Sequence, residues 1–488
     1  MIKFYIYSYF FSFLITGQLI VNLYFIPKTI SYTFFSYLFF NILFWLLCLM
    51  FLHIVKYWEM PNIRPLLYEL NINSIDYPTV DILIPCYNEE IETITQTLQG
   101  ALNINYPPFL FSVHLLDDGK RNELKEFCET HNIGYITRDN NKFQKAGNLN
   151  NFLRNFQSNL ISVLDCDMIP DKNFLQRLVP YFFDMDGKFN SNVGFVQSKQ
   201  YFYNNDYSND FFDMDNSIYT KITMCTMNNL GQCPYIGTGG LLSFEILERI
   251  NFFHEGHATE DTITSLKICN LPNIISFYCY PFVLAKGFAP ETIAEAFDQR
   301  LRWVKGNVQL ILEYNPLCMV NLNIKQKFLW FASNAYWVFG LLFFVYIVDN
   351  IVYIFLLFFD DSPPSSITNN IIYSISYLSQ ILAFMFLPEV TFLEKIRTIQ
   401  MFICYIPVYI ISFLSAIFSC IPISIVSNKS KQRNFHILFL FHFIIFGLIF
   451  ILCLFGLFFM NRFDPFKIYS YCMYIVTYFL IFFLKFYR

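Results

Sequence analysis

Four short motifs contain the residues best suited to chemistry, and they follow one another along a single stretch of the chain. Three are acidic: Asp117-Asp118-Gly119, Asp165-Cys166-Asp167 and Thr259-Glu260-Asp261. The fourth, Gln299-Arg300-Leu301-Arg302-Trp303, offers an amide, two cations and an aromatic ring. Each motif alone occurs by chance in long chains. Their shared order within one segment, flanked by apolar runs, indicates one site.

Asp165 and Asp167 lie two residues apart, directly after the apolar run Leu160–Leu164. If that run is a strand, both carboxylates can turn toward one site. Mg²⁺ and Mn²⁺ take oxygen ligands and share them between one or two carboxylates and the phosphates of a substrate. A diphosphate leaving group needs this neutralisation. The pair is therefore predicted to hold a divalent metal and the nucleotide; the alternative is a solvated turn.

Three further positions each allow a functional and a structural interpretation. Asp261 begins an apparent helix, so it is either a helix cap or the general base that sugar transfer to a hydroxyl with inversion requires. Asp117 and Asp118 could accept hydrogen bonds from a nucleoside, or form a plain turn. Lys145 could reach a pyrophosphate, or be a surface lysine. His254 and His257 have no ligand spacing with a third group and are expected to be structural.

Gln299, Arg302 and Trp303 fall on one predicted helix, whose apolar side holds Ile293, Phe297, Leu301, Val304 and Val308. Arginine can bind a phosphate through two hydrogen bonds, and tryptophan offers a flat face to a sugar ring. An amphipathic helix at an interface, with a buried tryptophan, is the structural alternative, and both can hold together.

Strand-length apolar runs alternate with helical segments between residues 78 and 290. Val80–Pro85, Phe111–Leu116 and Leu160–Leu164 are expected to be strands, with a helix near 89–102. This alternation predicts an α/β domain with a parallel sheet. Ligands bind beyond the carboxyl ends of such strands, where two of the acidic motifs fall. The dinucleotide-binding and P-loop glycine patterns are absent.

The composition indicates a membrane protein. The 488 residues are 55% hydrophobic and only 14% charged, with a net charge of −4 that gives no reason to expect nucleic-acid binding. The 13 cysteines are scattered and are expected to be reduced and buried. Runs long enough to cross a bilayer lie at about 4–26, 33–55, 328–348, 371–393, 435–460 and 468–484.

The run 399–425 is ambiguous, and charge decides its placement. If it crossed the membrane, the basic cluster 429–433 would lie outside, against the positive-inside tendency. We therefore expect it to lie flat at the cytoplasmic interface. The predicted organisation is a transmembrane hairpin (1–60), a cytoplasmic catalytic domain with interfacial helices (78–320) and a C-terminal region (321–488) with four spans and one interfacial segment.

The segment resembles the processive family 2 glycosyltransferases, and most closely the catalytic subunit of cellulose synthase. The resemblance covers about 240 residues and is carried by the four motifs above together with Pro85–Glu89, Leu116–Arg121, Lys145–Asn150, Val196–Asn204, Gly237–Gly239 and Gly287–Thr292. It implies a GT-A glycosyltransferase domain on the cytoplasmic face that uses a UDP-sugar, Mg²⁺ or Mn²⁺, and a growing glycan chain. It also implies an integral, multi-pass protein of the plasma or inner membrane, with an accessory export subunit as a possible partner.

The resemblance also implies a role for each matching residue. Tyr87 and Glu89 would lie at the uracil, Asp117 or Asp118 beside the nucleoside, and Lys145 at the diphosphate. Asp165 and Asp167 would hold the nucleotide and the metal, and Asp261 would be the base. Gln299, Arg302 and Trp303 would bind the pyrophosphate and the acceptor end of the polymer.

The chain departs from the family pattern at four places. Ser424–Lys429 stands where the family has a gating loop, with Ser for Phe and Ser for Thr. Met168 stands where bacterial cellulose synthases usually have His. Two N-terminal spans are expected where the bacterial enzyme has four, and no cyclic-di-GMP-binding PilZ domain is expected.

Several alternatives remain open at this stage. UDP-glucose polymerised into β-1,4-glucan leads, with β-1,3-glucan, mannan, chitin and hyaluronan as other products. Thr259-Glu260-Asp261 lacks the Glu-Asp-Arg or Asp-Asp-Arg form common in chitin and hyaluronan synthases. A distributive membrane glycosyltransferase would add a single sugar. A transporter would place ionisable residues in the spans, where few are found, among them Asp349 at one span's end and His442.

Overall fold

The computed structural model describes residues 57–338 except 71, 74–75, 185, 207–209 and 211, together with 387, 389–418 and isolated positions between 340 and 451. The predicted spans at 4–26, 371–393 and 468–484, and the Ser424–Lys429 segment, lie outside or almost outside these residues. The predicted span at 33–55 also lies outside the described residues, and the spans at 328–348 and 435–460 are described at one end or at a few positions only.

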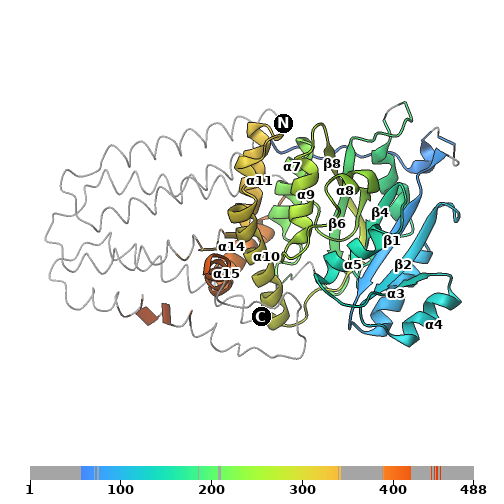
Figure 1. The fold of residues 1–488 in the computed structure, drawn as a ribbon. Helices are drawn as coiled ribbons and strands as arrows, with labels where there is room; N and C mark the ends of the chain where they lie inside the picture. The colour runs from blue at the N-terminus through green and yellow to red at the C-terminus, as the bar shows by residue number, and fades with distance from the viewer. Residues whose placement is uncertain are drawn as a thin grey trace, which may run out of the picture.

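One mixed sheet of eight strands forms the centre of the described chain, in the order β3-β2-β1-β4-β7-β6-β8-β5 (Figure 1). β1 pairs in parallel with β2 and β4, and β2 in parallel with β3, as the sequence predicts for the first half. β6 also pairs in parallel with β8, whereas β7 is antiparallel to both β4 and β6, and β5 is antiparallel to β8. The sheet is therefore mixed, with the predicted parallel pairing confirmed for only part of it. The strands are β1 Val80–Cys86, β2 Phe111–Asp117, β3 Gly134–Ile136, β4 Leu160–Val163, β5 Ile169–Pro170, β6 Val193–Phe202, β7 Gly240–Ser243 and β8 Ile275–Gly287.

Both faces of the sheet are covered, which explains why β1 is apolar along nearly its whole length. Ile82 and Ile84 point into one core with α3 (Ile91–Leu102), α4 (Asn122–Thr130) and α6 (Phe174–Leu178). Leu83 points into the opposite core with α5 (Gln144–Leu153), α8 (Phe244–Arg249) and α9 (Glu260–Cys269). The alternation follows from the two-residue period of a strand.

A third core joins the sheet domain to a group of helices beside it (Figure 1). The long helix α10 (Ile293–Glu313) contributes the buried Leu301, Val304 and Val308. It packs against α15 (Ile406–Phe418), and α14 (Phe392–Cys404) precedes α15. The remaining elements are α7 (Met224–Asn229), α11 (Ile324–Ala335), the π-helical turn η5 (Tyr219–Thr223) and the 3₁₀ turns η1 (Leu67–Glu69), η3 (Val179–Phe182), η6 (Pro316–Cys318) and η7 (Tyr336–Val338).

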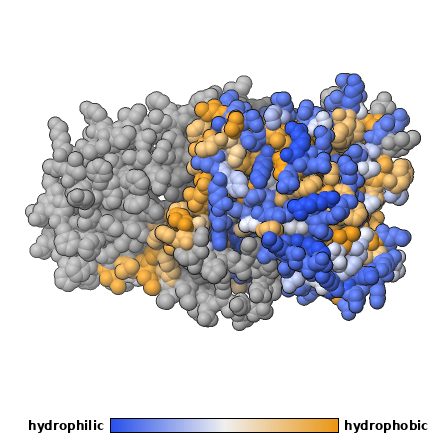
Figure 2. Space-filling view, viewed as in Figure 1, coloured by the Kyte–Doolittle hydropathy of each residue, from blue (hydrophilic) through white to orange (hydrophobic). Residues whose placement is uncertain are grey.

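Apolar side chains gather along α11 and around α14 and α15, whereas hydrophilic side chains dominate the visible face of the sheet domain (Figure 2). Among the described residues, no single helix has the length and apolarity to span a membrane. Only α14 and α15 pass that test together, as a pair bent by 56°. The flat placement of 399–425 stays a prediction, and the bend divides that segment into two helices.

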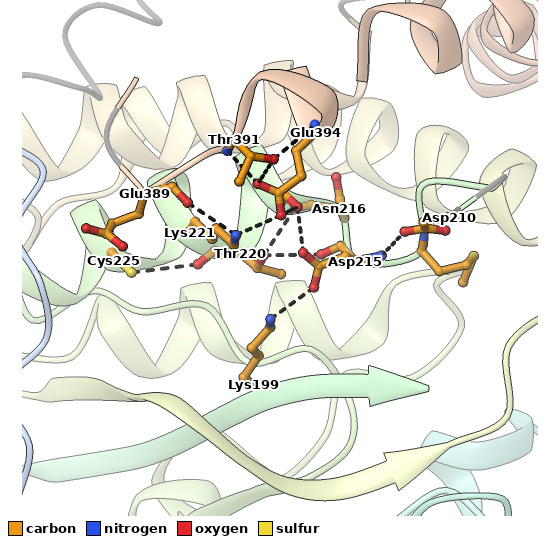
Figure 3. Close-up of polar contacts among 12 residues, drawn as sticks. Lys199, Asp210, Asp215, Asn216, Thr220, Lys221, Cys225, Glu389, Thr391 and Glu394 are labelled. Atoms are coloured by element: carbon orange, nitrogen blue, oxygen red, sulfur yellow. Dashed lines mark hydrogen bonds and ion pairs between the residues drawn. The ribbon is translucent and has the colours of Figure 1, made fainter. Parts of the chain in front are cut away.

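A polar network, here called the docking network, fastens α14 to the sheet domain (Figure 3). Lys221 of η5 donates to Glu394 of α14 at 2.7 Å, and Ser217 donates to the same carboxylate at 3.0 Å and to Asp215 at 2.5 Å. Lys199 of β6 forms an ion pair with Asp215 at 3.0 Å. Charged groups from β6, η5 and α14 therefore meet in one largely buried cluster.

Candidate functional site

The turn after β4 carries Asp165 and Asp167, and hydrogen bonds join it to a second turn at residues 237–239. The backbone N–H of Asp165 donates to Thr238 Oγ1 at 3.0 Å, and Gly239 N–H donates to Val163 O at 3.0 Å. Gly237 and Gly239 both have left-handed φ values, of 86° and 65°, which favour glycine at these positions. The sequence Gly237-Thr238-Gly239 is thus the support on which the aspartate turn rests.

Lys145 connects the two turns. It lies in the first turn of α5, and its Nζ donates to Asp165 Oδ1 at 2.5 Å and to Gly237 O at 2.9 Å. Burial favours the neutral amine, but Asp165 and then Glu260 outweigh it, so the pKa of Lys145 is raised and the side chain stays cationic. The predicted phosphate-binding lysine therefore lies beside the predicted metal-binding aspartate.

The two aspartates suit a divalent cation, although they supply only part of the ligand set that such an ion needs. Burial, and then the charge of Asp165, raise the pKa of Asp167 to about 7. Two hard carboxylates, one of which raises the pKa of the other by its charge, are stabilised by an added positive charge. In the part of the chain that the structure describes, no group of three or more His, Cys, Asp or Glu residues is arranged around a metal. The remaining ligands would therefore come from a substrate.

Glu260 and Asp261 begin α9, and both lie near Lys145 and Asp165. A Cβ on Gly237 would lie 2.8 Å from Asp261 Oδ2, so this carboxylate rests directly against the supporting turn. Its other oxygen, Oδ1, accepts from Thr262 N–H at 2.7 Å. Burial raises the pKa of both Glu260 and Asp261, and each is also influenced by Lys145 and Asp165. Asp261 combines a helix-start position with a raised pKa, as a general base near neutral pH needs.

The turn that carries Asp261 touches α10 at a glycine. A Cβ on Gly306 would lie 2.4 Å from Thr259 Cγ2 and 2.5 Å from Thr259 Oγ1, so no larger residue fits without movement. On the other side, His257 Nδ1 accepts from Thr259 N–H at 3.2 Å. Burial, and then His254 and Lys305, lower the pKa of His257 to about 4, so the imidazole is neutral. As predicted, both histidines have structural contacts: His254 lies between Lys267 Nζ (3.1 Å) and Tyr314 Oη (3.0 Å).

Residues Gln299, Arg302 and Gly306 lie three and four positions apart on α10 and therefore share one face. Burial lowers the pKa of Arg302, while Glu260 and then Asp165 oppose the shift, which places the guanidinium close to the acidic turns. Gln299 Oε1 is buried and makes no hydrogen bond within the described residues. Trp303 is half-buried, with its ring 5.3 Å from that of Trp337. Its role as an acceptor platform stays a prediction.

Two of the residues predicted to contact the nucleoside, Asp117 and Asp118, are held by hydrogen bonds within the protein. Asp117 is fully buried and accepts from Gly119 N–H (2.9 Å), Arg121 N–H (2.8 Å) and Tyr135 Oη (2.9 Å). Burial would raise its pKa, but the Arg121 hydrogen bonds lower it below the ordinary value. Asp118 is held by both nitrogens of Arg138, each at 2.6 Å.

Of the four residues predicted at the nucleoside, only Tyr87 is strongly exposed. Its side chain is 43% exposed, and its N–H donates to the partly buried Glu89 at 2.7 Å. Contact of Tyr87, Glu89, Asp117 and Asp118 with a nucleoside stays a prediction.

Sequence reasoning missed Arg138. Besides Asp118, it donates to Lys142 O at 2.7 Å and to Gln144 O at 2.9 Å, which closes the loop just before Lys145. The only sequence signal was a lone arginine after a three-residue strand, which is too weak to single out. The structure shows that it ties the Asp118 turn to the start of the lysine helix.

Comparison with known proteins shows a family match over part of the chain. Residues 78–306 match the family described as glycosyltransferase like family 2. The UDP-forming cellulose synthase catalytic subunit of Xanthomonas axonopodis pv. citri (strain 306) is 28% identical over 270 residues, covering 54% of this chain and 36% of that protein. The UDP-forming catalytic subunit of cellulose synthase 1 from Komagataeibacter xylinus is 28% identical over 292 residues, covering 59% of this chain and 38% of that protein. The chain thus spans less than two-fifths of the length of these relatives.

Among solved structures, a mannosyltransferase from Pyrobaculum calidifontis, in complex with GDP-Man and Mn²⁺, aligns with a TM-score of 0.54. The alignment covers 79% of this chain and 99% of that chain at 15% sequence identity, and at that identity it bears on the fold alone. The described domain has a GT-A-like fold with a mixed sheet, which confirms the predicted α/β class in this coarser form.

Proposed function

We propose that the chain, whose residues 78–306 match the family described as glycosyltransferase like family 2, is a membrane-embedded, processive β-glycan synthase. It adds glucose from UDP-glucose to a growing β-1,4-glucan and exports the chain through its own spans. The similarity to UDP-forming cellulose synthase catalytic subunits supports this choice of donor and product. The catalytic domain lies on the cytoplasmic side, and an accessory export subunit is a partner.

One observation carries the proposal. Four segments that are distant in sequence place a cation or a carboxylate at the same point: Lys145 from α5, Asp165 after β4, Asp261 from α9 and Arg302 from α10. Cations beside acidic groups suit a substrate that carries phosphates and needs a base close to them. A transporter domain or a structural module would have no need for this set.

The chemistry assigned to these residues is a single displacement. Asp261 takes the proton from the hydroxyl at the end of the acceptor while that oxygen bonds to C1 of the donor sugar from the opposite side. The bond between C1 and the diphosphate oxygen breaks, and UDP leaves with the electron pair. Lys145 and Arg302 offset the charge that develops on the diphosphate.

Asp165 and Asp167 would hold Mg²⁺ or Mn²⁺. The ion supplies further neutralisation of the leaving diphosphate when bound. The Mn²⁺ in the archaeal mannosyltransferase of similar fold supports the choice of a divalent metal.

The test is to incubate membranes containing the full chain with each radiolabelled UDP-sugar and to digest the product with linkage-specific glycanases. We expect incorporation from UDP-glucose into a long product that a β-1,4-glucanase degrades, and loss of incorporation in excess EDTA. Asp261→Asn should lower the rate about 10²–10⁴-fold while UDP binding persists. Glu313→Gln, the same acid-to-amide change at the exposed end of α10, is the matched control.

Three results would contradict parts of the proposal. A single added sugar would indicate a distributive glycosyltransferase. Incorporation from another UDP-sugar alone would reject glucose as the donor. Near-normal synthesis by the Asp261→Asn variant would remove that residue as the base.

A further inference from the structure

Arg300 lies inside the Gln299–Trp303 motif but points away from the acidic turns. Arg300 is only 5% exposed, and among the described residues no carboxylate lies within ion-pair distance of it, although the buried carboxylate of Asp213 is near enough to act on its charge. Its hydrogen bonds go to backbone: Nη2 donates to Asp213 O at 2.9 Å and to Phe212 O at 3.4 Å. A buried guanidinium without an ion-pair partner is costly unless other groups stabilise it.

Besides the charge of Asp213, aromatic rings stabilise the guanidinium. The guanidinium carbon lies 4.9 Å from the centre of the Trp303 ring, 5.7 Å from that of Trp337 and 5.6 Å from that of Tyr405. All three distances are within the range of cation–π attraction, which is strongest for tryptophan and for desolvated cations. Because Arg300 and Trp303 are three positions apart on α10, they lie on neighbouring turns. One arginine thus contacts rings from α10, η7 and the link between α14 and α15.

The same neighbourhood is tied to the rest of the molecule. Tyr336, next to Trp337, donates from Oη to Asn216 at 2.8 Å. Ser412 of α15 donates to Leu301 O at 3.2 Å, on the helix turn that follows Arg300. Because the Trp303 ring lies 5.3 Å from that of Trp337, these contacts outside α10 help to hold the neighbourhood of the Trp303 ring.

We propose that Arg300 is a positioning residue for the acceptor: its guanidinium fixes the plane of the Trp303 ring, and so sets how well the end of the growing glycan is held. The inference rests on the proposed function. A flat ring stacks on a sugar in one orientation only, so a ring free to turn would hold the polymer end less often. Arg300 itself touches neither the donor nor the reacting atoms.

The experiment compares Arg300→Lys and Arg300→Met with the unaltered full chain. Lysine keeps the charge but loses the planar group, and methionine keeps the length but loses the charge. For each we would measure UDP affinity, donor KM, initial rate of transfer and product length. We expect mean product length to fall about tenfold in Arg300→Met, which matches the loss of a desolvated cation–π contact. Product length should also fall in Arg300→Lys, because the ammonium has no planar face to stack on the Trp303 ring. UDP affinity and donor KM should stay within about twofold of the unaltered protein in both variants.

Val304→Ala is the matched control for a purely structural role. Val304 is fully buried in the same core and one turn further along α10. It should lower thermal stability without shortening the product. Trp337→Phe is a second test of the proposal, because it reduces the aromatic surface around Arg300 and leaves the arginine itself in place. If the Arg300 variants do not accumulate, this variant decides the matter.

Two results would overturn the inference: products of normal length from Arg300→Lys, Arg300→Met or Trp337→Phe, or product shortening in Val304→Ala equal to theirs at the same loss of stability. Absence of any polymer from the unaltered chain would instead reject the proposed function.

Discussion

Replacing Gly306 by alanine should separate the two halves of the site. The new Cβ would lie 2.4 Å from Thr259 Cγ2 and 2.5 Å from Thr259 Oγ1, whereas carbon atoms in contact are about 3.5–4.0 Å apart. Either α10 or the Thr259–Asp261 turn must therefore move by about 1 Å. A displacement of about that size between reacting groups can cost about 100-fold in rate. We expect kcat to fall by about that factor.

Loss of stability would not explain such a fall. Alanine favours a helix interior over glycine by about 1 kcal/mol, which offsets part of the crowding. UDP affinity should change little, because Lys145, Asp165 and the Gly237 turn do not contact Gly306 in any described interaction. The assay is the initial rate of radiolabelled sugar transfer at saturating UDP-sugar, together with UDP binding measured on the same purified protein.

A second substitution tests the cause. Thr259→Ala removes both crowded atoms and leaves the Thr259 Cβ 2.9 Å from the new methyl group. The pair Gly306→Ala with Thr259→Ala should therefore be at least about tenfold faster than Gly306→Ala alone. Wild-type turnover in Gly306→Ala, or no recovery in the pair, would refute the argument that this contact sets the distance between α9 and α10.

Three further outcomes follow from described contacts. The pKa of the buried His257 is about 4, against 6.5 for an ordinary histidine. Its contribution to stability is present above pH 6.5 and lost as pH falls toward 4, by about 2 kcal/mol at pH 5. The melting temperature of His257→Gln should therefore fall less between pH 7 and pH 5 than that of the unaltered protein. Breaking the docking network (Figure 3) by Lys221→Met or Glu394→Gln should cost about 1–3 kcal/mol each, with the double variant losing less than the sum. The exposed pair Lys125–Glu129, whose atoms are 3.9 Å apart, is the control and should contribute under about 0.5 kcal/mol; additive losses in the network would disprove coupling. Arg138→Lys keeps the charge but cannot hold Asp118 through two nitrogens, so calorimetry should show UDP affinity weakened about tenfold; unchanged affinity would reject a role for the Asp118–Lys145 link.

The sequence determined the parts of the site that depend on local pattern. Apolar runs of strand length ending in acidic residues predicted β1, β2 and β4 to within a residue or two, and placed Asp117 and Asp165 at the carboxyl edge of the sheet. Parallel neighbouring strands bring those ends together whatever the details of the connections. The periodicity of residues 293–308 likewise predicted α10 and its buried positions Leu301, Val304 and Val308.

Only the tertiary structure decided which residues meet across the chain. No local pattern shows that β7 inserts antiparallel beside β4, and that pairing is what brings the Gly237 turn under Asp165. The contacts of Arg138 with Asp118, of Gly306 with Thr259 and of Arg300 with Trp337 and Tyr405 join segments 20 to 105 residues apart. Periodicity reports which face of an element is buried, but not which element covers it; that depends on the path of the whole chain and on the packing of its cores.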